Sequence, residues 1–299
     1  MFERILLPLD GSELSEMALP YGEELASKLG SEVILYHVHE HKHSRQEHMH
    51  QMYLDRLAET VQSNLKKGQP KGTEVKVTTK VEAGEPTENI CNLVDKNKVD
   101  LIIMTAVSVS GLKVGKMLGS VTDRVCQTVP IPVMLIRPQS VKQSDKKGRL
   151  VNRMLIPLDG SEISKLALPV GEELATKLKI STTLFQMATM VRFYDDGSES
   201  NAYMDYTKLN ENEKKRVSAE MMALEKKLKE RGLDVTNIVI SGFDAAYEII
   251  EVCKKIGADM VVISTHGRSG LGRWVFGNVA ERVLRHVETP LLLVHARAG

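Results

Sequence analysis

Residues 4–29 read RILLPLDGSELSEMALPYGEELASKL and residues 153–178 read RMLIPLDGSEISKLALPVGEELATKL, with 19 of 26 positions identical. The second copy begins 149 residues after the first in a chain of 299 residues, so the repeated unit has the length of a whole domain. The sequence therefore predicts two copies of one fold. We expect a first domain at residues 1–138, a second domain at residues 151–299, and a polar linker at residues 139–150, which has no apolar periodicity.

Each copy alternates short runs of aliphatic and β-branched residues with longer stretches of helical periodicity. The predicted strands are residues 5–9, 32–38, 75–81, 101–104 and 133–136 in the first copy, and 154–158, 182–186, 235–240, 260–263 and 291–294 in the second. Near-continuous apolar strands separated by helices are typical of a parallel sheet covered on both faces. We predict two tandem doubly wound, Rossmann-like α/β domains, each with a five-stranded parallel sheet and helices on both faces. Such sheets bind ligands beyond the carboxyl ends of their strands.

The charge balance argues against polyanionic partners. The chain has 40 Lys and Arg residues against 39 Asp and Glu residues, which leaves no basic excess for nucleic acid or an anionic membrane. Three cysteines, an odd number spread through apolar segments, favour free buried thiols over a disulfide framework. The first apolar run stops at Pro8, too short for a signal sequence, and no run approaches about 18 apolar residues. We expect a cytoplasmic protein with no nucleic-acid or membrane partner.

A glycine-rich loop in the second copy carries the clearest signal of function. Residues 264–284 read STHGRSGLGRWVFGNVAERVL, with four glycines between the fourth predicted strand and an amphipathic helix. Glycine admits positive φ and close backbone approach, so amide N–H groups can surround an anion. The helix that begins near Gly277 adds unpaired N–H donors and a favourable dipole. These features predict a phosphate cradle, to which Arg268 and Arg273 would add charge. The Asn278 amide would either donate to a phosphate oxygen or cap the helix.

The strand that ends in PLDGS at residues 157–161, and the loop in which nine residues separate Gly267 from Gly277, resemble the universal stress protein family in its tandem form. The resemblance covers nearly the whole chain. It implies five-stranded parallel α/β domains, whose nucleotide-binding members hold ATP through a G-x-x-G-x9-G-[S/T] loop. The chain departs from that pattern at Ser264, in place of the first glycine, and at Asn278, in place of the terminal Ser or Thr.

The resemblance also implies roles for residues outside the loop. The acid after the first strand of each copy, Asp10 or Asp159, would contact the nucleoside, and the backbone at Met187 and Ala188 would face the adenine. The alternative is that Asp-Gly-Ser only turns the chain and caps the next helix. The predicted ligand is ATP, accompanied by Mg²⁺. Its predicted contacts are Pro157, Leu158, Asp159, Met187, Ala188, Thr265, His266, Gly267, Arg268, Gly270, Gly277, Asn278 and Val279 in the second copy, and Asp10, Gly119 and Ser120 in the first.

The same loop in the first copy departs further from the pattern. Its helix start at residues 119–120 is intact, but Ser108 stands near the position of Gly267, between Val107 and Val109, and the loop is one residue longer. Because β-branched residues disfavour positive φ, the close backbone wrap should be impaired. We therefore expect one working nucleotide site per chain, in the second copy.

Six of the nine histidines lie between His37 and His50, a density that raises the alternative of a metal site. On a strand, His39 and His41 would share a face and chelate a divalent ion such as zinc. A solvated polar loop explains these residues without a metal, because nothing in the sequence makes their side chains converge. We therefore predict no metal site.

The leading hypothesis is an ATP-binding protein of stress response or signalling, in which the nucleotide biases conformation or partner choice. The sequence has no G-x-x-x-x-G-K-[ST] lysine, nucleophile elbow or paired-carboxylate metal site, so we assign no catalytic residue and expect at most the slow ATP hydrolysis that the resemblance implies. A second hypothesis is a scaffold with empty sites. The family resemblance implies that the last strands of the copies, residues 133–136 and 291–294, would pair as an internal pseudo-dimer. A third is an adenylyl-transferring enzyme of the related α/β group. A homodimer of whole chains is a further expected assembly.

Overall fold

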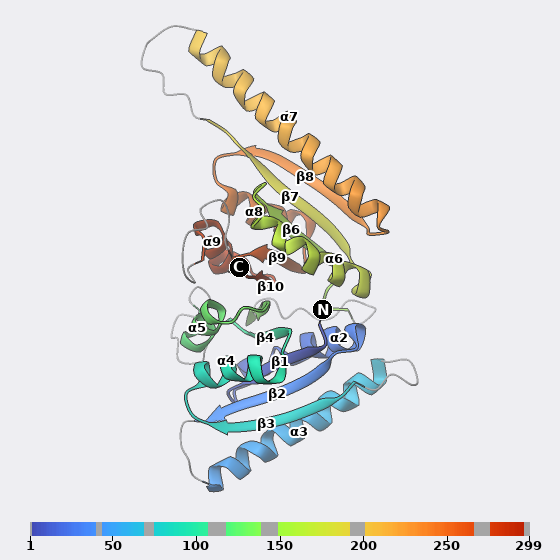
Figure 1. The fold of residues 1–299 in the computed structure, drawn as a ribbon, viewed down its shortest axis with the longest axis vertical. Coiled ribbons are helices and arrows are strands. Elements are labelled where there is room, and N and C mark those ends of the chain that lie inside the picture. The colour runs from blue at the N-terminus through green and yellow to red at the C-terminus, as the bar shows by residue number, and fades with distance from the viewer. Residues whose placement is uncertain are drawn as a thin grey trace. The chain divides into compact units, whose positions relative to one another are not determined.

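The computed structural model describes residues 2–39, 44–68, 75–106, 118–138, 149–191, 201–265 and 276–295. These residues fold into two compact units. The first unit holds the elements of the first sequence copy together with the last strand of the second copy, and the second unit holds the remaining elements of the second copy. In each unit, helices pack on a mostly parallel sheet (Figure 1).

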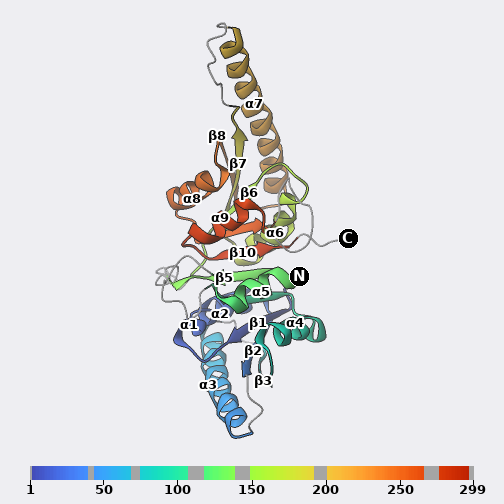
Figure 2. The same cartoon turned by 90° about the vertical axis from the view of Figure 1, so that its left-hand side faces the viewer.

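Five parallel strands form the first unit's sheet in the order β3-β2-β1-β4-β5. The strands are β1 (Arg4–Leu9), β2 (Glu32–His39), β3 (Val77–Ala83), β4 (Leu101–Thr105) and β5 (Val133–Ile136). The helices are α1 (Glu13–Glu16), α2 (Leu19–Leu29), α3 (Ser44–Gly68), α4 (Pro86–Asn97) and α5 (Ser120–Thr128). Helices α2 and α3 pack together on one face of the sheet, and α4 and α5 pack together on the other (Figure 2).

The second unit repeats this arrangement with four parallel strands in the order β9-β6-β7-β8. The strands are β6 (Arg153–Leu158), β7 (Ser181–Thr189), β8 (Val235–Gly242) and β9 (Met260–Ser264). The helices are the short 3₁₀ helix η2 (Ser164–Leu166), α6 (Ala167–Leu178), α7 (Asn201–Glu230), α8 (Ala245–Ile256) and α9 (Asn278–His286). Figure 2 shows α6 and α7 on one side of these strands and α8 and α9 on the other. The predicted tandem doubly wound fold is confirmed.

The repeated Gly-Glu-Glu-Leu motif is explained by close packing of a helix on the first strand of each repeat. A Cβ atom at Gly171 on α6 would lie 2.4 Å from Cδ1 of Ile156 on β6. A Cβ atom at Gly22 on α2 would lie 2.7 Å from Cδ1 of Leu7 on β1. Because protein cores are packed nearly as densely as organic crystals, a larger residue at either position would require the facing side chain or the helix to shift.

The last strand, β10 (Leu291–Val294), belongs to the second copy in sequence but pairs with β5 of the first copy, in antiparallel orientation. The register places Leu291 opposite Leu135, Leu292 opposite Met134, and Leu293 opposite Val133. Every residue of both strands is buried. The predicted pairing of the two last strands is therefore confirmed.

The other predicted strands agree with the structure to within three residues. The third strand of the first copy begins at Val77 rather than at residue 75, and β7 continues to Thr189 rather than ending at residue 186. In the part of the chain that the structure describes, no helix combines the length and the apolar composition needed to cross a membrane.

The register of β5 and β10 predicts a specific cross-link. Residues 134 and 292 are opposed in an antiparallel ladder, where facing Cα atoms lie about 4.5–5.5 Å apart and within disulfide reach. A chain with Met134→Cys and Leu292→Cys should form an intrachain disulfide on mild oxidation, detected as one linked peptide pair by mass spectrometry.

The matched control carries Met134→Cys with Leu293→Cys. A shift of one residue turns the side chain to the opposite face of the sheet, so this chain should not form the link. Equal linkage in the two variants would contradict the register.

Candidate functional site

The second unit contains a cavity of about 290 Å³ at the carboxyl edge of its parallel strands. Its walls come from the ends of β6, β7 and β9 and from the amino ends of α8 and α9. The lining residues are Pro157, Leu158, Asp159, Ser164, Phe185, Met187, Thr189, Ala245, Ile249, Ile263, Ser264, Gly277, Asn278, Val279 and Ala280. This is where open α/β sheets bind ligands, because the connections diverge there.

One wall of the cavity is made by alternate residues of β7. Phe185, Met187 and Thr189 line it, since successive side chains of a strand point to opposite faces. Ala188 is absent from the lining, and its side chain is 1% exposed. Met187 thus lines the cavity and Ala188 does not, while the predicted contact of their backbone with the adenine stays a prediction.

The amino end of α9 forms the opposite boundary of the cavity. Its N-cap is Gly277, which has an extended backbone (φ −62°, ψ 148°) and no side-chain cap. The Gly277 N–H donates to the carbonyl oxygen of Thr265 at 2.9 Å and so ties the helix start to the end of β9. Asn278 is the first helical residue, so the alternative that its amide caps the helix is wrong. Thr265 is 1% exposed and does not line the cavity. Its carbonyl oxygen holds the start of α9 in place through the hydrogen bond from Gly277.

Asp159 lines the cavity and also shapes the turn after β6. Its Oδ1 accepts hydrogen bonds from the backbone N–H and the hydroxyl of Ser161, at 2.9 and 2.6 Å. The Ser161 hydroxyl accepts in turn from the N–H of Ser164 at 3.1 Å. The expectation that this motif turns the chain is confirmed, whereas neither η2 nor α6 has a side-chain N-cap. Contact of Asp159 with a nucleoside stays a prediction.

Asp10 makes the same turn in the first repeat. Its Oδ1 accepts from the N–H and the hydroxyl of Ser12 at 3.0 and 2.6 Å, and the Ser12 hydroxyl caps α1 by accepting from the N–H of Ser15. Burial of Asp10 opposes its ionisation, but the hydrogen bonds from Ser12 and Ser15 outweigh burial and lower its pKa. Asp10 is therefore a carboxylate near neutral pH.

A smaller cavity, of about 130 Å³, occupies the equivalent place in the first unit. It includes the predicted residues Asp10, Gly119 and Ser120. Two hydroxyl-bearing side chains line it where the second unit has smaller ones. Tyr36 donates to the Glu82 carboxylate at 2.5 Å and stands where the second repeat has Phe185. Thr122 donates to the carbonyl oxygen of Thr105 at 3.0 Å and stands where the second repeat has Ala280.

Several predicted residues lie outside the described part of the chain. They are His266, Gly267, Arg268 and Gly270 in the second copy, and residues 107–109 in the first. The structure describes the helix start of the predicted phosphate cradle in each repeat. Gly119 and Gly277, the N-caps of these helices, have nearly the same backbone conformation.

The comparison with known families decides the classification. The sequence model of the universal stress protein family matches residues 1–137 and again residues 151–295. The chain belongs to this family. Universal stress protein MJ0531 of Methanocaldococcus jannaschii is 29% identical over 145 residues, which cover 48% of this chain and 82% of the relative. Universal stress protein YxiE of Bacillus subtilis is 29% identical over 148 residues, which cover 48% of this chain and 99% of the relative.

Solved structures match the whole tandem chain. A universal stress protein from Archaeoglobus fulgidus superposes with a TM-score of 0.70 at 19% identity, covering 98% of each chain. The protein PA1789 of Pseudomonas aeruginosa superposes with a TM-score of 0.72 at 16% identity, covering 98% of this chain and 92% of that one. At these identities, the likeness shows that this universal stress protein shares their fold.

Sequence reasoning missed a set of residues that line the cavity of this universal stress protein. They are Ser164, Phe185, Thr189, Ala245, Ile249, Ile263 and Ala280, together with Ser264, noted only as a departure from the family loop. The period of two along β7 could have pointed to Phe185 and Thr189 once Met187 was selected. The residues of α8 have no such signal, because only the fold brings that helix to the edge of β7.

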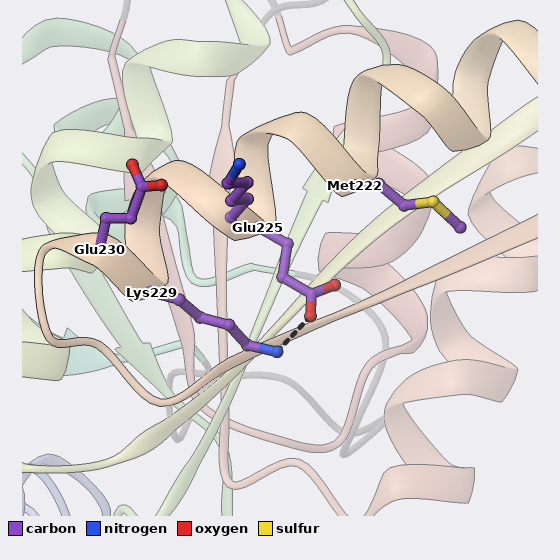
Figure 3. Close-up of a pocket in the computed structure, with 5 residues that line it drawn as sticks. Met222, Glu225, Lys229 and Glu230 are labelled. Carbon is purple, nitrogen blue, oxygen red and sulfur yellow. Dashed lines mark hydrogen bonds and ion pairs between the residues drawn. The ribbon is translucent and has the colours of Figure 1, made fainter.

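A larger hollow, of about 500 Å³, lies on the surface of α7 (Figure 3). It is lined only by residues of this one helix, namely Met222, Glu225, Lys226, Lys229 and Glu230. The Lys229 ammonium is paired with the Glu225 carboxylate at 2.5 Å. A single helix face with internally paired charges does not bring groups from different elements together, so we assign no ligand to it.

The histidine-rich segment differs from its prediction as a solvated polar loop. His37 and His39 belong to β2 and are only 4% and 7% exposed. The ring of His50, on α3, stacks on both, with centroid distances of 4.3 and 5.1 Å. Nδ1 of His37 donates to the carbonyl oxygen of Leu9 at 2.8 Å. The prediction of a solvated loop is therefore wrong for His37 and His39, which are buried beneath α3. His41 and His43 lie outside the described residues.

The stacked rings do not form a metal centre in this structure. Within the described ranges, no three His, Cys, Asp or Glu side chains are placed to hold a metal ion. Burial, and then the neighbouring histidines, lower the pKa of His37 despite its bond to Leu9. Burial and the charge of His39 lower the pKa of His50. The lowered pKa values of His37 and His50 favour the neutral imidazole of these two residues in the folded first repeat.

This cluster predicts that acid destabilises the first repeat. The unfolded chain binds protons near the ordinary histidine pKa of about 6.5, whereas folded His37 and His50 bind them only at lower pH. The free energy of unfolding should therefore be fully retained above that value and fall as the pH drops below it. Urea unfolding midpoints at pH 7.5 and 5.5 measure the effect.

The control for this prediction is His37→Gln, because the second repeat has Gln186 at the same position of β7. The variant removes one titrating group, so its midpoint should depend less on pH than that of the wild type. An equal dependence in the two chains would show that His37 does not contribute.

Proposed function

We propose that the second repeat binds an adenine nucleotide in the 290 Å³ cavity, and that the bound nucleotide biases conformation or partner choice in stress response or signalling. The observation that carries this proposal is the composition of one cavity. It combines an apolar wall, a carboxylate and a helix amino terminus at the carboxyl edge of a parallel sheet. A mainly apolar pocket with a few convergent polar groups is the usual form of a small-molecule site.

Each part of the cavity suits one part of a nucleotide. Phe185, Met187 and Ile249 offer apolar surface to a flat base. Asp159 offers a carboxylate that accepts hydrogen bonds from ribose hydroxyls. The amino end of α9 offers N–H donors and a positive dipole end to phosphate. ATP with Mg²⁺ is the proposed ligand, and residues 266–270 of the glycine-rich loop are proposed to complete its phosphate contacts.

We further propose that only the second repeat binds nucleotide tightly. The first cavity has less than half the volume, about 130 Å³, and Tyr36 and Thr122 are held in it by their hydrogen bonds. The proposed compartment is the cytoplasm, a reducing environment that suits the free thiols Cys91, Cys126 and Cys253.

A scaffold that binds no nucleotide is the second candidate function. The antiparallel pairing of β5 with β10 favours it, because this pairing joins the two sequence copies through buried apolar strands. Calorimetric titration of nucleotide-stripped protein with ATP and Mg²⁺ separates the two functions. A stoichiometry of one ATP per chain would support the proposed site, and two would show that the first repeat also binds ATP. No binding would favour the scaffold.

Gly277→Val tests the position of the site. Gly277 lines the cavity, and its φ of −62° is open to any L-residue, so valine should add side-chain bulk without backbone strain. We expect the affinity for ATP to fall by at least about a hundredfold, measured by the same titration, while the unfolding midpoint changes little.

The matched control is Gly119→Val, the equivalent helix start in the first repeat, with φ −62°. It should leave the stoichiometry at one ATP per chain. Unchanged affinity in a folded Gly277→Val chain would overturn the site, and a lower stoichiometry in Gly119→Val would show that the first repeat binds.

A further inference from the structure

Ser264, the last residue of β9, carries a buried hydroxyl that satisfies no hydrogen bond. The residue is 4% exposed, it lines the cavity of the second unit, and its Oγ has no partner. Buried polar groups without partners are uncommon, because they have lost water and gained nothing in return. A ligand in the cavity would supply the missing partner.

The amino end of α9 presents further unpaired donors to the same cavity. Asn278, Val279 and Ala280 line it, and they are the first three residues of a nine-residue helix. Their N–H groups lie in the helical turn that has no intrahelical acceptors, and Gly277 provides no side-chain cap. Ser264 and these three residues therefore line one cavity from two separate elements.

The positive end of the α9 dipole favours an anion at this end of the cavity. Among the described residues, Arg282, one turn into α9, is already paired with Asp244 through two hydrogen bonds of 2.9 and 2.8 Å. Asp159, which follows β6, would repel an anion placed against it. A ligand with one anionic end would therefore be oriented with that end toward α9.

The first repeat has hydroxyl side chains both at the end of β4, in Thr105, and at the start of the following helix, in Ser120. There, α5 begins with Ser120, whereas α9 begins with Asn278. The Thr122 hydroxyl donates to the carbonyl oxygen of Thr105, the last residue of β4. The second repeat has Ala280 in place of Thr122. In the second repeat, the strand end has a hydroxyl, that of Ser264, whereas the helix start has none, because its first residue is Asn278.

We propose that Ser264 Oγ and the first N–H groups of α9 together bind a phosphoryl group of the ligand, and that Ser264 thereby distinguishes phosphorylated nucleotides from nucleosides. This inference rests on the proposed nucleotide function. It assigns the hydroxyl donor of the site to the end of β9 rather than to the first residue of the helix.

The test compares Ser264→Ala with wild-type full-length chain in titrations with ATP and with adenosine. A hydrogen bond to a charged phosphate is among the stronger ones, so we expect ATP binding to weaken about tenfold while adenosine binding stays within about twofold. The thermal midpoint of the ligand-free variant should equal or exceed that of the wild type, because the lost hydroxyl had no partner. A purely structural role would instead lower that midpoint.

Two further variants complete the design. Thr182→Val removes another buried hydroxyl without a partner, on β7 of the same unit but outside the cavity lining, and should leave both affinities unchanged. Ser264→Thr keeps a hydroxyl and should retain most of the ATP affinity, as Thr105 shows that threonine fits at this strand end.

The outcomes separate the two claims. Wild-type binding of ATP and adenosine, with Ser264→Ala weakening neither or both equally, would overturn the phosphoryl contact and leave the nucleotide site standing. Failure of the wild-type chain to bind either ligand would overturn both.

Discussion

The pairing of β6 with β7 on one side and β9 on the other is the constraint on which the candidate site depends. The chain leaves β6 for β7 and β8 and then returns across the sheet to β9, so the connections diverge at the carboxyl edge of β6. Three parallel strands end at this edge and bring Asp159, Met187 and Ser264 into one cavity. The amino end of α9 closes it through the hydrogen bond from Gly277 to Thr265, which joins the helix to the end of β9.

The two repeats share this frame but fill it differently. In the first, the hydroxyls of Tyr36 and Thr122 are bonded to Glu82 and to the Thr105 carbonyl, and these side chains occupy the crevice. In the second, phenylalanine and alanine at these positions have no such bonds, and the cavity is about 290 rather than 130 Å³. Near-identity around the first strand thus accompanies the same backbone frame, while the side chains that line the two cavities, and the cavity volumes, differ.

Much of the fold and part of the site could be predicted from the sequence. Asp159, Met187, Gly277, Asn278 and Val279 were expected at the site and do line the cavity. Ala188 and Thr265 were also expected there but are not among the residues that line the cavity, because one side of a strand faces away from it and the end of β9 is buried; the expected backbone contact at Ala188 stays a prediction. The histidines of β2 were misread for a related reason, since local polarity does not reveal that α3 covers them.

The sequence by itself determined the tandem repeat, the parallel α/β class, the strand positions and the starts of α5 and α9, because these depend on periodicity and turn chemistry over a few neighbouring residues. Only the tertiary structure decided that α8 contributes to the cavity, that α3 covers the histidines of β2, and that Ser264 keeps a buried hydroxyl without a partner. Each of these depends on contacts between separate elements of the chain. Such contacts are selected by packing and burial, which no local pattern records.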